Sequence, residues 1–171
     1  MLKMLLPITL ALATSVAAAP LKIKDSSVSF EATGNPGFLT IPGTGGKLTA
    51  KKLESDGAYI WGEFEVQLKD FDTGMALRND HMLNKYLLVE QYPVATLSLE
   101  KTPVSAKKFT GKLTIKTDTK AVGGSFEKKG SSVKASFVVN IDDFPSIGKP
   151  NWKGIGLEGD VKIEVSATVS H

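Results

Sequence analysis

The stretch "AYIWGEFEVQLK" (residues 58–69) decides the fold class, because apolar and polar side chains alternate along it. The apolar positions are Ile60, Gly62, Phe64, Val66 and Leu68. The positions between them hold Tyr59, Trp61, Glu63, Glu65 and Gln67. A period of two residues is typical of a β-strand, whose successive side chains point to opposite faces. The stretch therefore predicts a strand of an antiparallel sheet with one apolar and one wetted face.

The same alternation recurs along the rest of the chain. It is clear in the segments "FTGKLTIK" (109–116), "SVKASFVVN" (132–140) and "DVKIEVSATV" (160–169). Shorter candidate strands cover residues 28–32, 38–41, 47–53, 94–100 and 120–126. Turn signals such as "SDG", "KKG" and "IPGTGG" separate the segments. A chain of 171 residues suits a single domain, and this many strands in one domain predict an all-β barrel or sandwich.

Charge and composition exclude several classes of function. The formal net charge is +3, and the lysines occur as scattered pairs such as Lys51–Lys52 and Lys107–Lys108. Nucleic-acid binding needs a concentrated basic face, so no nucleic acid is expected as a partner. The chain contains no cysteine, which excludes disulfides, thiolate chemistry and cysteine-ligated metals.

Residues 1–18 have the layout of a secretory signal peptide. A positively charged start is followed by a short apolar stretch and then by small residues, and the apolar stretch is too short to span a bilayer. Cleavage is expected after Ala18, because a cut one residue later would place Pro20 directly behind the scissile bond. Residues 19–171 then form one exported domain without a transmembrane segment. We expect it in the periplasm, with the extracellular space as the alternative.

One stretch has a helical pattern, "DTGMALRNDHMLNKYLLVEQYP" (72–93). It predicts one short helix after residue 72, with Asp72 or Thr73 as the N-terminal cap. The helix should end before Tyr92–Pro93, because the residue ahead of a proline avoids the α region.

His81 is the only internal histidine, which limits its roles. A zinc site needs three or four ligands, and the other histidine is the terminal His171, so no metal is expected. We expect Arg78 and His81 to donate hydrogen bonds to backbone carbonyls or carboxylates where the helix packs on the strands. A Ser-His-Asp arrangement stays open, because Asp80 and several serines are present, but such partners occur in nearly every chain. No catalytic residue is therefore assigned.

Two motifs resemble those of the YceI-like family of bacterial secreted proteins. In the central signature of that family an Arg and a His precede a Tyr-Leu pair and then a Tyr-Pro pair. The matching residues here are Arg78, His81, Tyr86, Leu87, Tyr92 and Pro93. The segment "GKLTIKTDTKAV" (111–122) is similar to the family's G-x-L-T-I-x-x-x-T-K-x-V. The sequence departs from the family at Thr117 and Ala121, where glycine and proline are frequent.

The resemblance implies a lipocalin-like, up-and-down antiparallel β-barrel of about eight strands that holds one long apolar chain, such as a polyisoprenoid. The residues expected to line the apolar bore are Phe30, Ile60, Phe64, Val66, Leu97, Leu113, Phe126, Phe137, Val139 and Ile163. Small residues interleave with them, namely Ala58, Gly62, Ala95, Gly111, Gly124 and Ala135. These small residues either leave free volume for a ligand or mark bulges and strand coiling.

The expected function is that of a periplasmic carrier or sequestering protein for such a lipid, without catalysis. No cofactor is expected beyond the bound isoprenoid or fatty lipid, and a homodimer stays open. An enzyme that acts on the lipid, with His81 as acid or base, is the alternative. A carboxylate or serine converging on His81 inside the bore would favour it. A stress-related structural or interaction module, stabilised by lipid, is the third reading.

Overall fold

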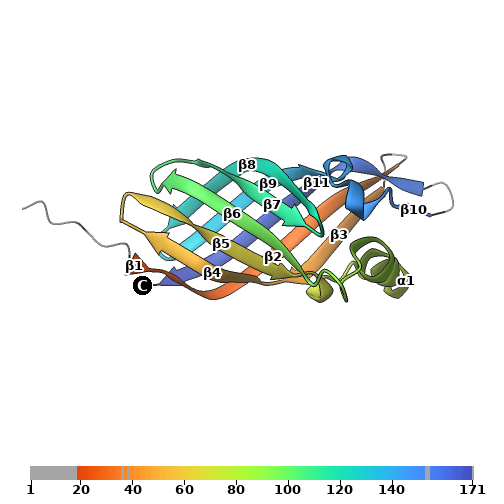
Figure 1. Ribbon diagram of the computed structural model, residues 1–171, viewed down its shortest axis with the longest axis horizontal. Coiled ribbons are helices and arrows are strands. Elements are labelled where there is room, and N and C mark those ends of the chain that lie inside the picture. Colours follow the sequence, from red (N-terminus) through yellow and green to blue (C-terminus); the bar gives the residue numbers. More distant parts are fainter. Residues whose placement is uncertain (1–18, 36, 38, 153–154, 171) are drawn as a thin grey trace, which may run out of the picture.

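The barrel architecture is visible directly in the strand pairing. The computed structural model describes residues 19–35, 37, 39–152 and 155–170. They form one antiparallel sheet that curls into an elongated barrel with helical segments at one end (Figure 1). The strands are β1 (Ala19–Pro20), β2 (Lys22–Asn35), β3 (Leu39–Gly46), β4 (Leu48–Ser55), β5 (Tyr59–Gln67), β6 (Val94–Pro103), β7 (Lys108–Ile115), β8 (Asp118–Lys129), β9 (Ser132–Asn140), β10 (Asn151–Trp152) and β11 (Ile155–Ser170).

The strand order is β1-β4-β5-β6-β7-β8-β9-β11-β2-β3, with β10 paired to β11. The described residues thus contain an 11-stranded sheet, of which β1 and β10 contribute only two residues each. The predicted all-β, antiparallel, lipocalin-like barrel is confirmed.

The strand register turns the alternation of the sequence into rows of inward side chains. Phe64 on β5 is paired with Leu97 on β6, and Leu97 is paired with Leu113 on β7. Within β7, Phe109, Gly111 and Leu113 are buried, whereas the two residues between them are exposed. The apolar faces of β5, β6 and β7 therefore point into the barrel.

The barrel closes between β2 and β4 without a continuous backbone ladder. β1 pairs with β4, and the backbone N–H of Leu21 donates to the carbonyl of Leu53 at 3.1 Å. Farther along, the hydroxyl of Ser26 donates to the carbonyl of Leu48 at 3.1 Å and accepts from its N–H at 2.9 Å. Beyond this point β2 leaves β4 and pairs with β3. A side-chain hydroxyl thus completes the barrel where the two strands separate.

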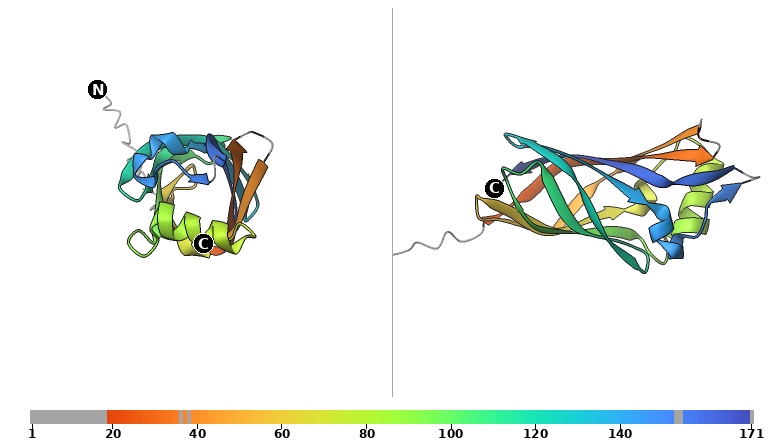
Figure 2. Two further views of the ribbon diagram at one scale, coloured as in Figure 1. Left: turned by 90° about the vertical axis from the view of Figure 1, so that its right-hand side faces the viewer. Right: turned by 90° about the horizontal axis from the view of Figure 1, so that it is seen from above.

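The helical segments gather at one end of the barrel, and the ends of the described chain lie at the other (Figure 1). They are η1 (Leu68–Asp70), α1 (Ala76–Asp80), η2 (His81–Leu87), η3 (Ile141–Asp143) and η4 (Pro145–Ile147). α1 continues directly into η2, which has π-helical geometry, and Figure 2 shows this helix crossing the barrel end. The predicted short helix is therefore present, but its second half is wound more loosely than an α-helix.

The predicted helix cap at Asp72 or Thr73 is wrong. The N-cap residue is Met75, without a side-chain hydrogen bond. Asp72 and Thr73 instead bind the side chain of Asn79, whose Nδ2 donates to Asp72 Oδ1 at 2.7 Å. The Oδ1 of Asn79 accepts from the N–H and the hydroxyl of Thr73 at 2.8 and 2.6 Å. The bonds from Asn79 and from the N–H of Gly74 hold the pKa of Asp72 below its ordinary value.

Gly62 serves a close approach of two backbones. A Cβ atom at Gly62 would lie 2.1 Å from the carbonyl oxygen of Lys52. The register also shifts on both sides of it, between Ala50 and Lys52 on β4 and between Ile60 and Gly62 on β5. The bulge interpretation therefore holds for Gly62.

Ala58 was expected among the inward-facing small residues. It is exposed instead, in the turn ahead of β5.

Candidate functional site

The barrel encloses two cavities with predominantly apolar walls. The helix-side chamber has a volume of about 500 Å³ and includes Met75, His81 and Met82 in its lining. The terminal chamber has a volume of about 430 Å³ and is bounded by residues near the chain ends, such as Leu21 and Val169. Small-molecule pockets commonly have volumes of about 300–1,000 Å³. Each chamber is therefore large enough for part of a lipid.

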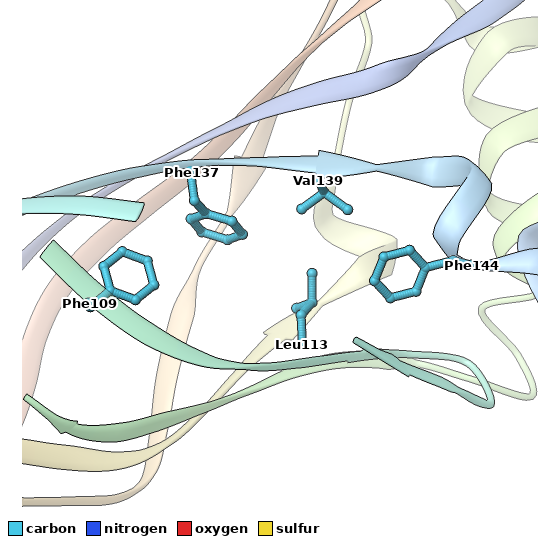
Figure 3. Close-up of a cluster of buried hydrophobic side chains, with 5 residues drawn as sticks. All are labelled: Phe109, Leu113, Phe137, Val139 and Phe144. Atoms are coloured by element: carbon cyan, nitrogen blue, oxygen red, sulfur yellow. The ribbon is translucent and has the colours of Figure 1, made fainter. Parts of the chain in front are cut away.

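The two chambers meet at a ring of side chains that line both, which we name the waist. It consists of Leu48, Phe64, Leu97, Phe137 and Val165. The ring of Phe137 meets that of Phe109 edge to face, with 5.8 Å between centroids (Figure 3). Gly124 makes room for both rings, because a Cβ atom there would lie 2.7 Å from Phe137 Cβ and 2.8 Å from Phe109 Cε1. Phe137 is thus held in place by its neighbours.

Every residue predicted to line the bore borders one of the chambers. The helix-side chamber alone is bordered by Phe30, Val66, Leu113, Val139 and Ile163. The terminal chamber alone is bordered by Ile60 and Phe126. Three of the predicted residues, Phe64, Leu97 and Phe137, belong to the waist and border both chambers. Of the interleaved small residues, Ala95 and Ala135 also line the chambers. Contact of any of these residues with a ligand stays a prediction.

Three large lining residues are missing from the predicted bore lining. Leu68 was expected on the apolar face of residues 58–69 but lies just beyond β5, and the other two lie outside the strands. Leu68, Phe71 and Phe144 line the helix-side chamber and are 5%, 9% and 1% exposed. They lie in or beside the short turns η1, η3 and η4. The ring of Phe71 meets that of Phe30 edge to face at 5.3 Å. Their sequence signal is a large apolar residue shortly after the end of a strand, as in "VQLKDF" (66–71) and "DDFPSI" (142–147). That signal could have predicted that they turn back into the barrel.

The polar side chains of the helix-side chamber lie mainly on the helix. Arg78, His81 and Tyr86 border it, together with Asn151. The Nη2 of Arg78 donates to the carbonyl of Thr73, but its Nε is buried without a partner among the described residues. The hydroxyl of Tyr86 donates to the carbonyl of Asn151 at 3.3 Å and accepts from its N–H at 3.1 Å.

The expected hydrogen bond from Arg78 to a backbone carbonyl is present, and the one from His81 is not. Within the described residues, the half-buried His81 ring makes no hydrogen bond and borders the chamber. The expectation for His81 is therefore wrong. Beyond His81 the chain follows π-helical geometry, which changes the direction of successive side chains from that of the α-helix assumed in the sequence analysis.

Tyr92 and Pro93 fix the return of the chain from the helix to β6. The helical geometry ends at Leu88, whose φ is 53°, so it ends before Tyr92 as predicted. The N–H of Tyr92 donates to the carbonyl of Leu88 at 2.9 Å, and the carbonyl of Pro93 accepts from the N–H of Leu68 at 2.8 Å.

Lys116 has a structural role that no pattern in the sequence indicates. Its ammonium donates to the carbonyls of Tyr86 at 3.0 Å and of Ser146, and so ties η2 to η4.

The chamber presents few groups for acid–base or metal chemistry. None of its described lining residues is an aspartate, a glutamate or a serine, so no such group meets His81 there. The part of the chain that the structure describes holds no group of three or more His, Cys, Asp or Glu suited to a metal ion. In the same part, no helix is long and apolar enough to cross a membrane.

Comparison with known proteins agrees with this architecture. No curated protein matches the chain. The crystal structure of Burkholderia cenocepacia BcnA shares 24% identity, covers 85% of this chain and 96% of its own, and superposes with a TM-score of 0.66. A polyisoprenoid binding domain from Saccharophagus degradans, implicated in plant cell wall breakdown, shares 11% identity with this chain. The match covers 88% of this chain and 97% of that domain, and the two superpose with a TM-score of 0.62. The family model of the YceI-like domain matches residues 21–169, and the chain therefore belongs to the YceI-like domain family.

Proposed function

We propose that the protein binds one long apolar lipid of the polyisoprenoid class inside its barrel. It acts as a periplasmic carrier or sequestering protein and catalyses no reaction on the lipid. The observation that carries this proposal is the pair of apolar chambers that meet at the waist, about 500 and 430 Å³ in volume. The fold is shared with a polyisoprenoid binding domain from Saccharophagus degradans, which supports the ligand class.

The apolar walls are sufficient to hold a lipid chain by burial alone. Each buried methylene contributes about 0.8 kcal/mol, so roughly ten enclosed carbons give a gross gain of about 8 kcal/mol. Ordering the chain and losing its free translation offset several kcal/mol of this gain. Longer chains should therefore bind with micromolar affinity or better.

A catalytic role for His81 lacks the partners that it would need. General acid–base or nucleophilic catalysis requires a second group within hydrogen-bonding reach of the histidine or of the reacting atoms. The described lining of the helix-side chamber offers no carboxylate or serine for that purpose. Sequestration or transport thus agrees better with the geometry than catalysis.

The location of the protein rests on residues 1–18, which lie outside the described residues. The sequence pattern of this segment supports export to the periplasm, with the extracellular space as the alternative. A lipid carrier in either place would shield an apolar chain from water between membranes.

Two measurements test the proposal in sequence. The exported protein is purified without detergent, and mass spectrometry identifies the lipid that it carries; a long isoprenoid or similar chain is expected. The stripped protein is then added to donor and acceptor vesicles, where a carrier should raise the transfer rate of a fluorescent isoprenoid in proportion to protein concentration. A protein that co-purifies with no lipid and binds no isoprenoid would contradict lipid binding. Binding without accelerated transfer would reduce the role to sequestration.

A further inference from the structure

The terminal chamber has a mouth of its own. Its lining includes the exposed turn residues Gly57, Gly130 and Ser131, at the end of the barrel where the described chain begins and ends (Figure 1). Phe137, which is 8% exposed, lies between this chamber and the helix-side chamber. A guest can therefore enter the terminal chamber without passing the waist.

One charged side chain belongs to the wall of the terminal chamber. Lys128 is the only charged residue among its described lining residues. Phe126 lies two residues earlier on β8 and lines the same chamber, so strand alternation places Lys128 on the inward face. The register agrees, because Lys128 is paired with Val133 on β9, which also lines the chamber. Lys128 thus continues an inward row of side chains as far as the mouth.

The ammonium of Lys128 has unused hydrogen-bond donors. It donates to the carbonyl of Gly130 at 2.8 Å, and an ammonium group carries three donors. Within the described part of the chain, the carboxylate ion pairs involve other lysines. The neighbouring Glu127 binds Lys129 at 2.9 Å. A lysine stem can lie along an apolar wall while its ammonium reaches water. Lys128 can therefore bind an anionic group at the mouth.

We propose that the terminal chamber is a second ligand site, for a single-chain amphiphile with an anionic head, such as a fatty acid. The alkyl chain lies along Phe126 and Val133 toward the waist, where burial stabilises it. The anionic oxygen of the head accepts a charge-assisted hydrogen bond from the ammonium of Lys128. The inference goes beyond the proposed function, because this guest binds separately from the isoprenoid in the helix-side chamber.

The first experiment compares four ligands that share one C12 alkyl chain: dodecanoate, dodecyl phosphate, dodecanol and dodecyltrimethylammonium. Each is titrated below its micelle-forming concentration. The parent should bind the better anion about threefold to fivefold more tightly than dodecanol, because an ion pair near the surface contributes modestly. The cation should bind most weakly, and added salt should reduce the anion preference. The order of the two anions identifies a carboxylate or a phosphate as the preferred head. Equal binding of all four ligands would overturn recognition of an anion.

Substitutions at two adjacent lysines test the role of Lys128. Lys128→Met keeps an apolar stem without a charge, and should bring the anion preference close to one while dodecanol binding is unchanged. Lys128→Glu should reverse the preference, so that the cation binds most tightly. Lys129→Met is the matched control, because the side chain of Lys129 is 79% exposed and pairs with Glu127, and it should keep the preference. An unchanged preference in both Lys128 variants would overturn the role of this lysine.

The second experiment tests whether the two sites are separate. Saturation of the parent with a C20 isoprenoid alcohol should leave the Lys128-dependent binding of dodecanoate unchanged. Val133→Trp places a large side chain in the terminal chamber, and should abolish that binding while isoprenoid binding persists. If Val133→Trp does not fold, the competition in the parent decides the question.

Failure of this inference differs from failure of the proposed function. Displacement of dodecanoate by the isoprenoid alcohol would mean that one lipid passes the waist, which overturns the second site and leaves isoprenoid binding intact. Lys128-dependent binding of dodecanoate by a protein that binds no isoprenoid would overturn the proposed function and leave the second site. No binding of any C12 ligand would overturn the second site.

Discussion

The hydroxyl of Ser26 binds both backbone polar groups of Leu48, donating to its carbonyl at 3.1 Å and accepting from its N–H at 2.9 Å. It stands in for the backbone of a neighbouring strand where β2 and β4 separate. Leu48 also belongs to the waist, so the closure of the barrel and the shape of its interior depend on the same residue.

Ser26→Ala should therefore destabilise the protein. The substitution leaves two partly buried backbone groups of Leu48 without partners, at a cost of about 1–3 kcal/mol in the free energy of unfolding. Chemical denaturation measures this change. Ser27→Ala alters the adjacent, exposed residue and should have little effect. Equal stability of the two variants would show that the hydroxyl does not hold the strands together.

Phe137→Arg and Val138→Arg form a matched pair on β9. Phe137 is 8% exposed and belongs to the waist, whereas Val138 is 54% exposed. Arginine at position 137 would bury an unpaired charge and should abolish folding or isoprenoid binding. Arginine at position 138 should do neither. Melting temperatures and titrations with an isoprenoid alcohol check both variants, and retained binding in Phe137→Arg would mean that the interior does not hold the ligand.

The waist should set how binding depends on chain length. In the parent, affinity for isoprenoid alcohols should rise with length and level off when the helix-side chamber is full. Phe64→Ala opens the waist, so affinity should continue to rise with longer chains. Phe126→Ala removes the same side chain from the terminal chamber alone and should leave the length dependence unchanged. Titration with a series of alcohols measures it, and identical profiles for both variants would contradict a barrier at the waist.

Acid should loosen the loop that precedes the helix. Hydrogen bonds from Asn79 and Gly74 lower the pKa of Asp72 from its ordinary value of 3.8. A lowered pKa in the folded state means that the carboxylate stabilises the fold above its ordinary pKa, and that this contribution is lost as the pH falls through the folded-state pKa. The melting temperature of the parent should drop more below about pH 4 than that of Asp72→Asn. Parallel pH profiles would contradict this role.

Export should remove residues 1–18. We expect the mature protein to begin at Ala19, because proline directly behind the scissile bond fits poorly. N-terminal sequencing of the protein from the periplasmic fraction and from the medium identifies the cut and the compartment. A chain that still begins at Met1 would contradict both.

The sequence predicted the barrel and its inward faces, because the two-residue period directly determines which side of a strand a residue faces. It could not predict cross-strand partners. Glu65 falls on the outer face as expected, yet its side chain is only 15% exposed, since Lys51 pairs with it at 2.6 Å. That contact depends on the register beside the bulge between Ala50 and Lys52.

The helical end was harder to predict than the strands. The prediction of one short helix after residue 72 assumed α-helical geometry throughout, whereas the chain is π-helical from His81 to Leu87. The hydrogen bonds from Asn79 to Asp72 and Thr73 were also not predicted. Asp72 and Thr73 are common helix caps, and the sequence does not show that the helix begins three residues later, after Met75.

The ammonium of Lys116 holds η2 through Tyr86 and η4 through Ser146. One cation thus joins two segments that come from distant parts of the chain and flank the helical end of the barrel. Neither segment can move away from the other until a charge-assisted hydrogen bond breaks. Lys116 therefore sets a kinetic barrier to the separation of η2 from η4, because both hydrogen bonds start from one ammonium group.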